Sequence, residues 1–205
     1  MTEEVKEKEV KEKEKDLKEI AKEAEGIKCV VARGIFFLNE FLDGPMCAKC
    51  LPCPMSSYEM RVRLEKLSAG AGSQADIDAM KRLAPNMLES SMCKKGKDTA
   101  KFVIDTLEKT PQIYADHVNG VCPDMQCKPL MVYRVIPDKC ESCGDCMDAC
   151  QDDAVIGEKK KGRYVGFLPY EIVDMRCTRC NRCIEACKYG AIEIVDIGLK
   201  ALAAV

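Results

Sequence analysis

Two runs of four cysteines near the C-terminus have the spacing of iron–sulfur cluster ligands. Each run reads C-x2-C-x2-C-x3-C, and the residues are Cys140, Cys143, Cys146 and Cys150, then Cys177, Cys180, Cys183 and Cys187. Cysteine thiolates at this spacing hold 4Fe-4S clusters. A pair of structural zinc knuckles is the alternative chemistry for clustered thiolates. Because the same spacing occurs twice, the sequence favours two clusters.

The ligation rule for this pattern pairs the two runs crosswise. In bacterial two-cluster ferredoxins, the first three cysteines of a run bind one cluster and the fourth binds the other. We therefore predict cluster A on Cys140, Cys143, Cys146 and Cys187, and cluster B on Cys177, Cys180, Cys183 and Cys150. The proline that usually follows the fourth cysteine is Gln151 in one run and Lys188 in the other. This departure removes no ligand.

A third set of cysteines begins in "MCAKCLPCP", where Cys47, Cys50 and Cys53 form C-x2-C-x2-C. A 4Fe-4S cluster with full cysteine ligation needs a fourth thiolate, and no fourth cysteine follows nearby. The candidates are the cysteines that lie outside the two C-terminal runs, namely Cys29, Cys93, Cys122 and Cys127. Spacing alone leaves the choice among them open.

The composition limits the class of protein. The chain has 205 residues, which is room for one or two small domains, with 15 cysteines and one histidine. Its net charge of −2 argues against nucleic-acid binding, for which "EKKKGRY" is the only local candidate. "MTEEVKEKEVKEKEK" contains no apolar signal core, and no run of 18 apolar residues predicts a membrane span. We expect a cytoplasmic protein, in which clustered cysteines bind metal because disulfides do not persist.

The chain divides into three segments by composition. Residues 1–26 are rich in Lys and Glu and predict a charged helix or a flexible segment. Residues 27–129 predict a helical domain that holds one cluster and a further metal site. Residues 130–205 predict strands around the cysteine loops, with a hairpin-like insertion whose tip is "EKKKG". The predicted fold class is α+β, a small helical bundle joined to a ferredoxin domain with two 4Fe-4S clusters.

Local signals place the helix ends within the second segment. Ser56 and Ser73 are predicted caps, and Asp98 is predicted to cap a helix that stops before Pro111. Pro85 is expected to break or restart its helix. The methionines at 55, 60, 80 and 87 are interpreted as core residues rather than as a partner-binding stripe.

The stretch from Cys47 to Gly96 resembles the C-terminal iron–sulfur domain of the NADH-binding flavoprotein subunit of respiratory complex I. It is equally similar to the matching subunit of electron-bifurcating hydrogenases. The shared features are the cysteine triplet with Pro52 before Cys53, the turn "GAGSQADID" and a lone cysteine in "SSMCKKG". The resemblance implies that cluster C is held by Cys47, Cys50, Cys53 and Cys93. The family's "ESCG" reads "GPMCA" here, and Pro54 replaces its arginine, but the ligands are intact.

The same resemblance extends to the remaining cysteines. "DHVNGVCPDMQCKPL" is similar to an H-x4-C-P-x3-C segment of the family, and "CVVARGIFFL" to a cysteine-containing segment of its hydrogenase branch. This implies a Cys3His set, which is a standard composition for structural zinc, made by Cys29, His117, Cys122 and Cys127. The 15 cysteines and the single histidine then divide into four sets of four. Unliganded core residues and a fourth iron–sulfur cluster remain as alternatives.

The resemblance covers about residues 28–198 and implies an electron relay without a catalytic site. The family's flavin and NADH sites lie upstream of the matching part, and this chain contains no G-x-G-x-x-G. We predict an electron-transfer subunit of an anaerobic oxidoreductase complex, with three 4Fe-4S clusters, a zinc ion and a large catalytic partner.

The sequence is compatible with two types of catalytic partner. A tungsten or molybdenum enzyme is favoured, because the small iron–sulfur subunit of tungsten-dependent benzoyl-CoA reductase looks similar in size and cluster number. A flavin- and NADH-binding subunit of a hydrogenase or dehydrogenase is the alternative. A ferredoxin or another electron-transfer subunit is a further partner. A zinc-dependent nucleic-acid module and a stand-alone ferredoxin shuttle are remote alternatives, since the first lacks basic patches and the second would not need the helical half.

Overall fold

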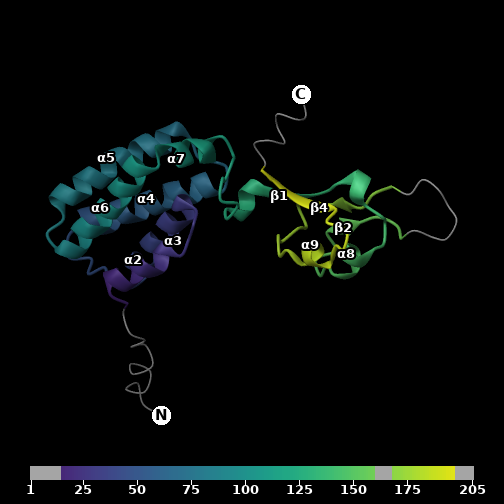
Figure 1. The fold of residues 1–205 in the computed structure, drawn as a ribbon. Coiled ribbons are helices and arrows are strands. Elements are labelled where there is room, and N and C mark those ends of the chain that lie inside the picture. The colour runs from purple at the N-terminus through teal and green to yellow at the C-terminus, as the bar shows by residue number, and fades with distance from the viewer. Residues whose placement is uncertain (1–14, 160–167, 197–205) are drawn as a thin grey trace, which may run out of the picture. The chain divides into compact units, whose positions relative to one another are not determined.

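The two halves of the chain differ in secondary structure, as their sequences predict. The computed structural model describes residues 15–159 and 168–196, and the chain divides into two compact units between Cys127 and Lys128 (Figure 1). The first unit consists of helices, and the second combines short strands with short helices, so the α+β class is confirmed. Residues 1–14 of the predicted charged segment and 160–162 of the predicted hairpin tip lie outside the described residues.

The helical unit is a bundle in which neighbours in sequence pack against each other. Helix α3 packs against α2 and α4, and α5 packs against α4 and α6. The helices are α2 (Leu17–Glu25), α3 (Val30–Asp43), α4 (Pro52–Ser68), α5 (Gln74–Ser90), α6 (Lys94–Lys109) and α7 (Pro111–Val118). None of these helices, nor any other in the described part of the chain, is both long and apolar enough to span a membrane.

Apolar residues spaced three and four apart form the core of this unit. On α4 the buried series is Met60, Leu64 and Leu67, and on α5 it includes Met80 and Met87. Each fully buried side chain of this size stabilises the fold by about 1.5–3 kcal/mol. The interpretation of Met60, Met80 and Met87 as core is therefore confirmed. It is wrong for the fourth methionine, Met55, whose side chain is 65% exposed.

Two predicted caps are wrong because the cysteine loops lead directly into helices. Helix α4 begins at Pro52 rather than after Ser56, since proline is well suited to the first helical turn, and Ser56 is buried within the helix. Helix α6 begins with Cys93 as its N-cap instead of Asp98. Both helices therefore start at predicted ligands of cluster C.

Pro85 does not end its helix. Helix α5 continues through it to Ser90. Proline removes one backbone hydrogen bond, but Pro85 faces solvent while Met80, Ala84 and Met87 keep the opposite face buried. The tertiary packing of that face outweighs the local penalty.

Asp76 joins the start of α5 to α4, and its removal is expected to destabilise the bundle. Its carboxylate accepts hydrogen bonds from the backbone N–H and hydroxyl of Ser73 at 2.9 and 2.8 Å, and from Arg63 at 2.8 Å. Burial alone would raise the pKa of Asp76, but these hydrogen bonds and the nearby Lys66 and Arg63 charges hold it below its ordinary value. The predicted cap at Ser73 is confirmed as a capping box.

We expect Asp76→Ala to lower the free energy of unfolding by about 2 kcal/mol in urea titrations. A group whose pKa is lowered by folding stabilises the protein above its unfolded pKa, about 3.9, and loses that effect as the pH falls further. The difference from wild type should therefore be constant between pH 5 and 8. Asp78→Ala is the matched control, because Asp78 is exposed and bonds only to Gln74 among the described contacts. Equal effects of the two substitutions would contradict the assignment.

The second unit is a twofold repeat of strand, cysteine loop and short helix. Its elements are β1 (Met131–Val135), α8 (Asp145–Asp148), β2 (Val155–Ile156), β3 (Glu171–Ile172), α9 (Arg182–Ala186) and β4 (Ile192–Asp196), with single 3-10 turns at Lys128–Leu130 and Pro137–Lys139. Strand β1 pairs antiparallel with β4, placing Tyr133 opposite Ile194, and β2 pairs antiparallel with β3. The two predicted strands are present, and β2 and β3 pair as the two ends of the predicted hairpin-like insertion.

The core of the second unit consists largely of cysteines and the aromatic and branched residues around them. Tyr133, Tyr170, Ile172 and Ile192 pack together with Cys146 and Cys183, and further cysteines lie at the edge of this cluster. Two-stranded sheets are marginal by themselves. We therefore expect groups bound by the cysteines to contribute to the stability of this unit.

Candidate iron–sulfur and metal sites

The Cys3His set that the resemblance implies is assembled in the helical unit. Cys29 is the N-cap of α3, His117 lies in the last turn of α7, and Cys122 and Cys127 follow in the next loop. Their ligand atoms all lie within 4.8 Å of one another, and all four residues are buried. These are four donors of the kinds that Zn²⁺ prefers, arranged around one point.

The spacing within this set fits a single tetrahedral ion. Cys29 Sγ lies 3.7 Å from Cys127 Sγ, and each sulfur lies 3.4 Å from His117 Nε2. A tetrahedral zinc site with ordinary bond lengths places two sulfurs about 3.8 Å apart and a sulfur and a nitrogen about 3.5 Å apart. A four-iron cube is larger and would hold its ligands further apart. The geometry therefore favours one ion over a fourth cluster.

Hydrogen bonds outside the set orient its ligands. His117 Nδ1 lies 2.7 Å from the carbonyl oxygen of Ile113, so Nδ1–H donates to it and the Nε2 lone pair is available to bind a metal ion. The backbone N–H of Cys29 donates to the side chain of Gln126 at 2.8 Å. Within the set, the hydrogen bond between the two thiols lowers the pKa of Cys29 and raises the pKa of Cys127. The pair therefore readily holds one thiolate, the form in which cysteine binds a cation.

Cluster A has its four predicted ligands around one small cavity. Cys140, Cys143 and Cys146 of the first run line it together with Cys187 of the second run. Cys146 is on α8, and Cys187 is the C-cap of α9. Burial, followed by the charges of Cys140 and Cys143, raises the pKa of the Cys146 thiol to about 11. Lys188, at the position where proline is usual, pairs with Asp145 at 3.2 Å.

Cluster B shows the corresponding arrangement of the second run. Burial and then the charge of Cys177 raise the pKa of Cys183 to about 11, and Cys180 contributes as well. Cys150 holds the position in the repeat that Cys187 holds in cluster A. The Ala154 N–H donates to Cys150 Sγ at 3.4 Å, and the Ala191 N–H donates to Cys187 Sγ at 3.3 Å. The assignment of Cys150 to cluster B stays a prediction that this symmetry supports.

The predicted ligands of cluster C lie where two helices begin. Burial raises the pKa of Cys53 to about 11, and the charges of Cys50, Cys93 and Cys47 add to this, so the four predicted ligands are neighbours. The positive ends of the α4 and α6 dipoles lie at Cys53 and Cys93, where they favour an anionic group. Gly96 lets the first turn of α6 pack closely here, because a Cβ would lie 2.9 Å from Ser91 Oγ and 3.2 Å from Cys53 Sγ.

Each of the three triplet loops contains a residue with left-handed backbone geometry. The φ angles are 50° at Ala48, 52° at Ser142 and 57° at Arg179. Such residues turn successive backbone N–H groups toward one side, which makes a concave site for an anion. The loops are therefore shaped to receive clusters before any side chain is considered.

Tyr133 and Tyr170 are residues of these sites that motif reading missed. Each is almost completely buried and lies beside the cysteine loops. The signal is present in the sequence, since Tyr133 precedes Cys140 by the same interval as Tyr170 precedes Cys177. This correspondence is visible only when the alignment of the two repeats includes the residues before the first cysteine of each run.

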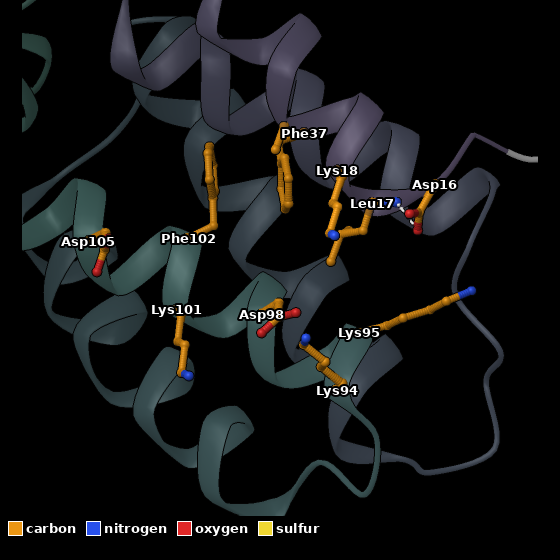
Figure 2. Close-up of a pocket in the computed structure, with 11 residues that line it drawn as sticks. Asp16, Leu17, Lys18, Phe37, Lys94, Lys95, Asp98, Lys101, Phe102 and Asp105 are labelled. Atoms are coloured by element: carbon orange, nitrogen blue, oxygen red, sulfur yellow. Dashed lines mark hydrogen bonds between the residues drawn. The ribbon is translucent and has the colours of Figure 1, made fainter.

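A groove of about 490 Å³ lies between α2 and α6 (Figure 2). Its floor contains the stacked rings of Phe37 and Phe102, whose centroids are 3.9 Å apart. Side chains of both charges surround the floor, and they are Asp16, Lys18, Lys94, Lys95, Asp98, Lys101 and Asp105. No cysteine or histidine lines this groove, so it belongs to none of the four ligand sets.

Fold and ligand sets together define an iron–sulfur protein of two domains. Residues 33–117 match the NADH-ubiquinone oxidoreductase-F iron-sulfur binding region, and residues 139–191 match the 4Fe-4S dicluster domain. The chain therefore carries both domains, and the fusion that the sequence resemblance indicated is confirmed.

Relatives with this combination or part of it are subunits of oxidoreductases. The chain is 31% identical over 134 residues to the NADP-reducing hydrogenase subunit HndC of Solidesulfovibrio fructosivorans, covering 65% of this chain and 27% of that protein. It is 31% identical over 96 residues to a subunit of the NADH-quinone oxidoreductase of Streptomyces coelicolor, covering 46% and 21%. It is 30% identical over 67 residues to the NADP(+)-dependent formate dehydrogenase subunit beta of Moorella thermoacetica, covering 33% and 10%. The chain thus spans about a quarter or less of the length of these relatives.

Proposed function

We propose that this chain is an electron-transfer subunit that relays single electrons through three 4Fe-4S clusters to or from a larger catalytic partner. The observation that carries the proposal is the division of twelve cysteines into three sets of four on two iron–sulfur domains. Clusters with four thiolate ligands carry one electron each, at potentials set by hydrogen bonds, charge and exposure. In this role the chain makes and breaks no covalent bonds of a substrate.

The Cys3His set is proposed to hold a structural Zn²⁺ ion. The tetrahedral spacing and the complete burial of the ligands support a closed site without an open position for water. Zinc has no redox chemistry, so the ion would stabilise the helical unit rather than carry electrons. Thiolate ligands in such number also favour a reducing compartment, for which we propose the cytoplasm.

The partner that the comparisons favour is a nicotinamide-linked oxidoreductase. The named relatives are subunits of an NADP-reducing hydrogenase, an NADH-quinone oxidoreductase and an NADP(+)-dependent formate dehydrogenase. We therefore propose a flavin- and nicotinamide-binding partner, with a ferredoxin as a further electron carrier. A tungsten or molybdenum enzyme of the benzoyl-CoA reductase type stays a prediction from the sequence.

Metal analysis of the chain, reconstituted without oxygen, tests the relay. We expect about twelve irons and one zinc per chain. Redox titration followed by electron paramagnetic resonance (EPR) should resolve three one-electron clusters. Four zincs without iron, or fewer than three clusters, would contradict the proposal. Isolation of the tagged chain with its co-purifying large subunit then identifies the partner.

The surface beside cluster C has the character of a docking face. Leu51, Met55 and Met92 are 73%, 65% and 88% exposed, and they adjoin the predicted ligands in sequence. Exposed lysines adjoin the same ligands in sequence at 49, 94, 95 and 97, and Lys94 and Lys95 also line the groove of Figure 2. We propose that an acidic face of the partner with an apolar centre docks here, which would bring its cofactor close to cluster C.

Reversal of charge on this face should weaken the complex. We expect Lys94→Glu with Lys97→Glu to lower affinity for the co-purified partner at least tenfold at low salt, with a smaller change at high salt. Titration calorimetry at two salt concentrations measures this. The matched control is Lys81→Glu with Arg82→Glu, two exposed charges on α5. If both double variants lost the same affinity, the effect would be one of general charge, and the proposed docking face would be contradicted.

A further inference from the structure

Tyr170 lies at cluster A with a hydroxyl that has nothing to bond to in the described part of the protein. Its side chain is 2% exposed and lines the cavity formed by Cys140, Cys143, Cys146 and Cys187. Among the residues that the structure describes, no group makes a hydrogen bond with this hydroxyl. Leaving a buried hydroxyl unsatisfied costs about 1–3 kcal/mol. The position therefore calls for an acceptor within the cavity.

The equivalent tyrosine at cluster B is satisfied by the protein. The hydroxyl of Tyr133 donates to the side-chain oxygen of Asn181, and Tyr133 lies near Cys177, Cys180 and Cys183. Asn181 directly follows the second cysteine of its run, and the residue at that position in the other run is Gly144. Both have left-handed backbone geometry, with φ of 68° and 88°. The two loops thus share one shape, and only the amide side chain is missing at cluster A.

One glycine packs against the Tyr170 ring, and another packs against the lysine that covers the place of the missing amide. A Cβ on Gly157 would lie 2.5 Å from Tyr170 Cδ1, so the ring packs directly on the backbone there. A Cβ on Gly144 would lie 2.2 Å from Lys159 Cε, so the lysine stem covers the place that an asparagine would fill. The Lys159 ammonium pairs with Asp148 at 2.5 Å. The ring is held against the cysteines, and its hydroxyl is closed off from solvent.

We propose that the Tyr170 hydroxyl donates a hydrogen bond to a sulfur of cluster A, and that cluster A is thereby reduced at a higher potential than cluster B. The inference rests on the proposed function, because it needs a cluster on these four cysteines. A reduced cluster carries one more negative charge than an oxidised one, so a donor to its sulfur stabilises the reduced form. Cluster B receives no such bond from its tyrosine, because the Tyr133 proton is used by Asn181.

Potentials measured by EPR titration of the reconstituted chain test this assignment. In Tyr170→Phe we expect the cluster A potential to fall while that of cluster B is unchanged. Tyr133→Phe is the matched control. It removes a hydroxyl that donates to Asn181 and not to a cluster, so neither potential should change. Cluster signals are assigned by comparison with variants that lack Cys187 or Cys150.

Two glycine and asparagine exchanges test the proposal with both rings intact. Gly144→Asn is made in a Lys159→Ala background, because the lysine stem fills the place of the asparagine side chain. It then gives Tyr170 the partner that Tyr133 has, so the cluster A potential should fall below that of Lys159→Ala alone. Asn181→Gly frees the Tyr133 hydroxyl, so the cluster B potential should rise. A merely structural role of Tyr170 would predict neither change.

A spectroscopic signature separates the hydrogen bond from packing. In the resonance Raman spectrum, iron–sulfur bands of cluster A should shift less on transfer to D₂O in Tyr170→Phe than in wild type, and the shift that remains is the part due to the Ala191 N–H at Cys187. Clusters that assemble fully, with a cluster A potential unmoved by Tyr170→Phe and by Gly144→Asn, would overturn this inference alone. A chain that takes up no iron would instead overturn the proposed function.

Discussion

Cys187→Ala is expected to remove cluster A and to leave clusters B and C in place. Cys187 belongs to the second run by sequence, but it lines the same cavity as Cys140, Cys143 and Cys146. A short loop can surround one cluster with three thiolates, and the fourth thiolate comes from the far side of the repeat. Iron content should fall from about twelve to about eight per chain, as measured by iron and sulfide analysis after reconstitution without oxygen.

Double variants decide which cluster Cys187 serves. If ligation is crosswise, Cys187→Ala with Cys143→Ala removes the same cluster twice, and about eight irons remain. Cys187→Ala with Cys180→Ala then removes two clusters and leaves about four. Ligation within each run predicts the opposite order. Cys150→Ala gives an internal control with the reverse outcome. Combined with Cys143→Ala it should leave about four irons, and combined with Cys180→Ala about eight.

Cys127→Ala is expected to release the zinc ion and to destabilise the helical unit strongly. The Cys3His set ties the start of α3 to the end of α7, and the sulfurs of Cys29 and Cys127 are separated by 98 residues of chain. Structural zinc contributes about 10–16 kcal/mol of apparent binding free energy in small zinc domains, and folding supplies the site. Loss of one ligand from a closed site should therefore lower the free energy of unfolding by on the order of several kcal/mol. The thermal midpoint of the helical signal should then fall by roughly 10 °C or more.

His117→Cys is the control that separates metal binding from packing. It changes the side chain in the same core but restores a four-ligand set, since sites made of four cysteines also bind zinc. We expect it to retain zinc and most of the stability, whereas His117→Ala should lose both. Zinc analysis and circular dichroism are the measurements. A Cys127→Ala chain that melts like wild type would show that these four residues are ordinary core.

The cysteine positions determined most of what the sequence could predict. Iron–sulfur loops are local, so C-x2-C-x2-C-x3-C at Cys140 and Cys177 specifies them without knowledge of the fold. Hydrophobic periodicity likewise predicted the helices of the first unit and the strands of the second. Cap signals were less reliable, because Cys93 and Pro52 start helices at positions where cluster loops, rather than the best capping residue, set the boundary.

Only the tertiary structure decided what surrounds each site. Pro85 lies within a helix because buried neighbours hold the opposite face. Met55 is exposed because it lies away from the face of α4 that buries Met60 and Leu64. Tyr133 and Tyr170 are equivalent in sequence, yet their hydroxyls differ in hydrogen bonding within the described residues, because Asn181 is matched by Gly144 across the repeat. Ligand identity is a local property of the chain. The burial, hydrogen bonds and charges that set a potential come from residues that only folding brings together.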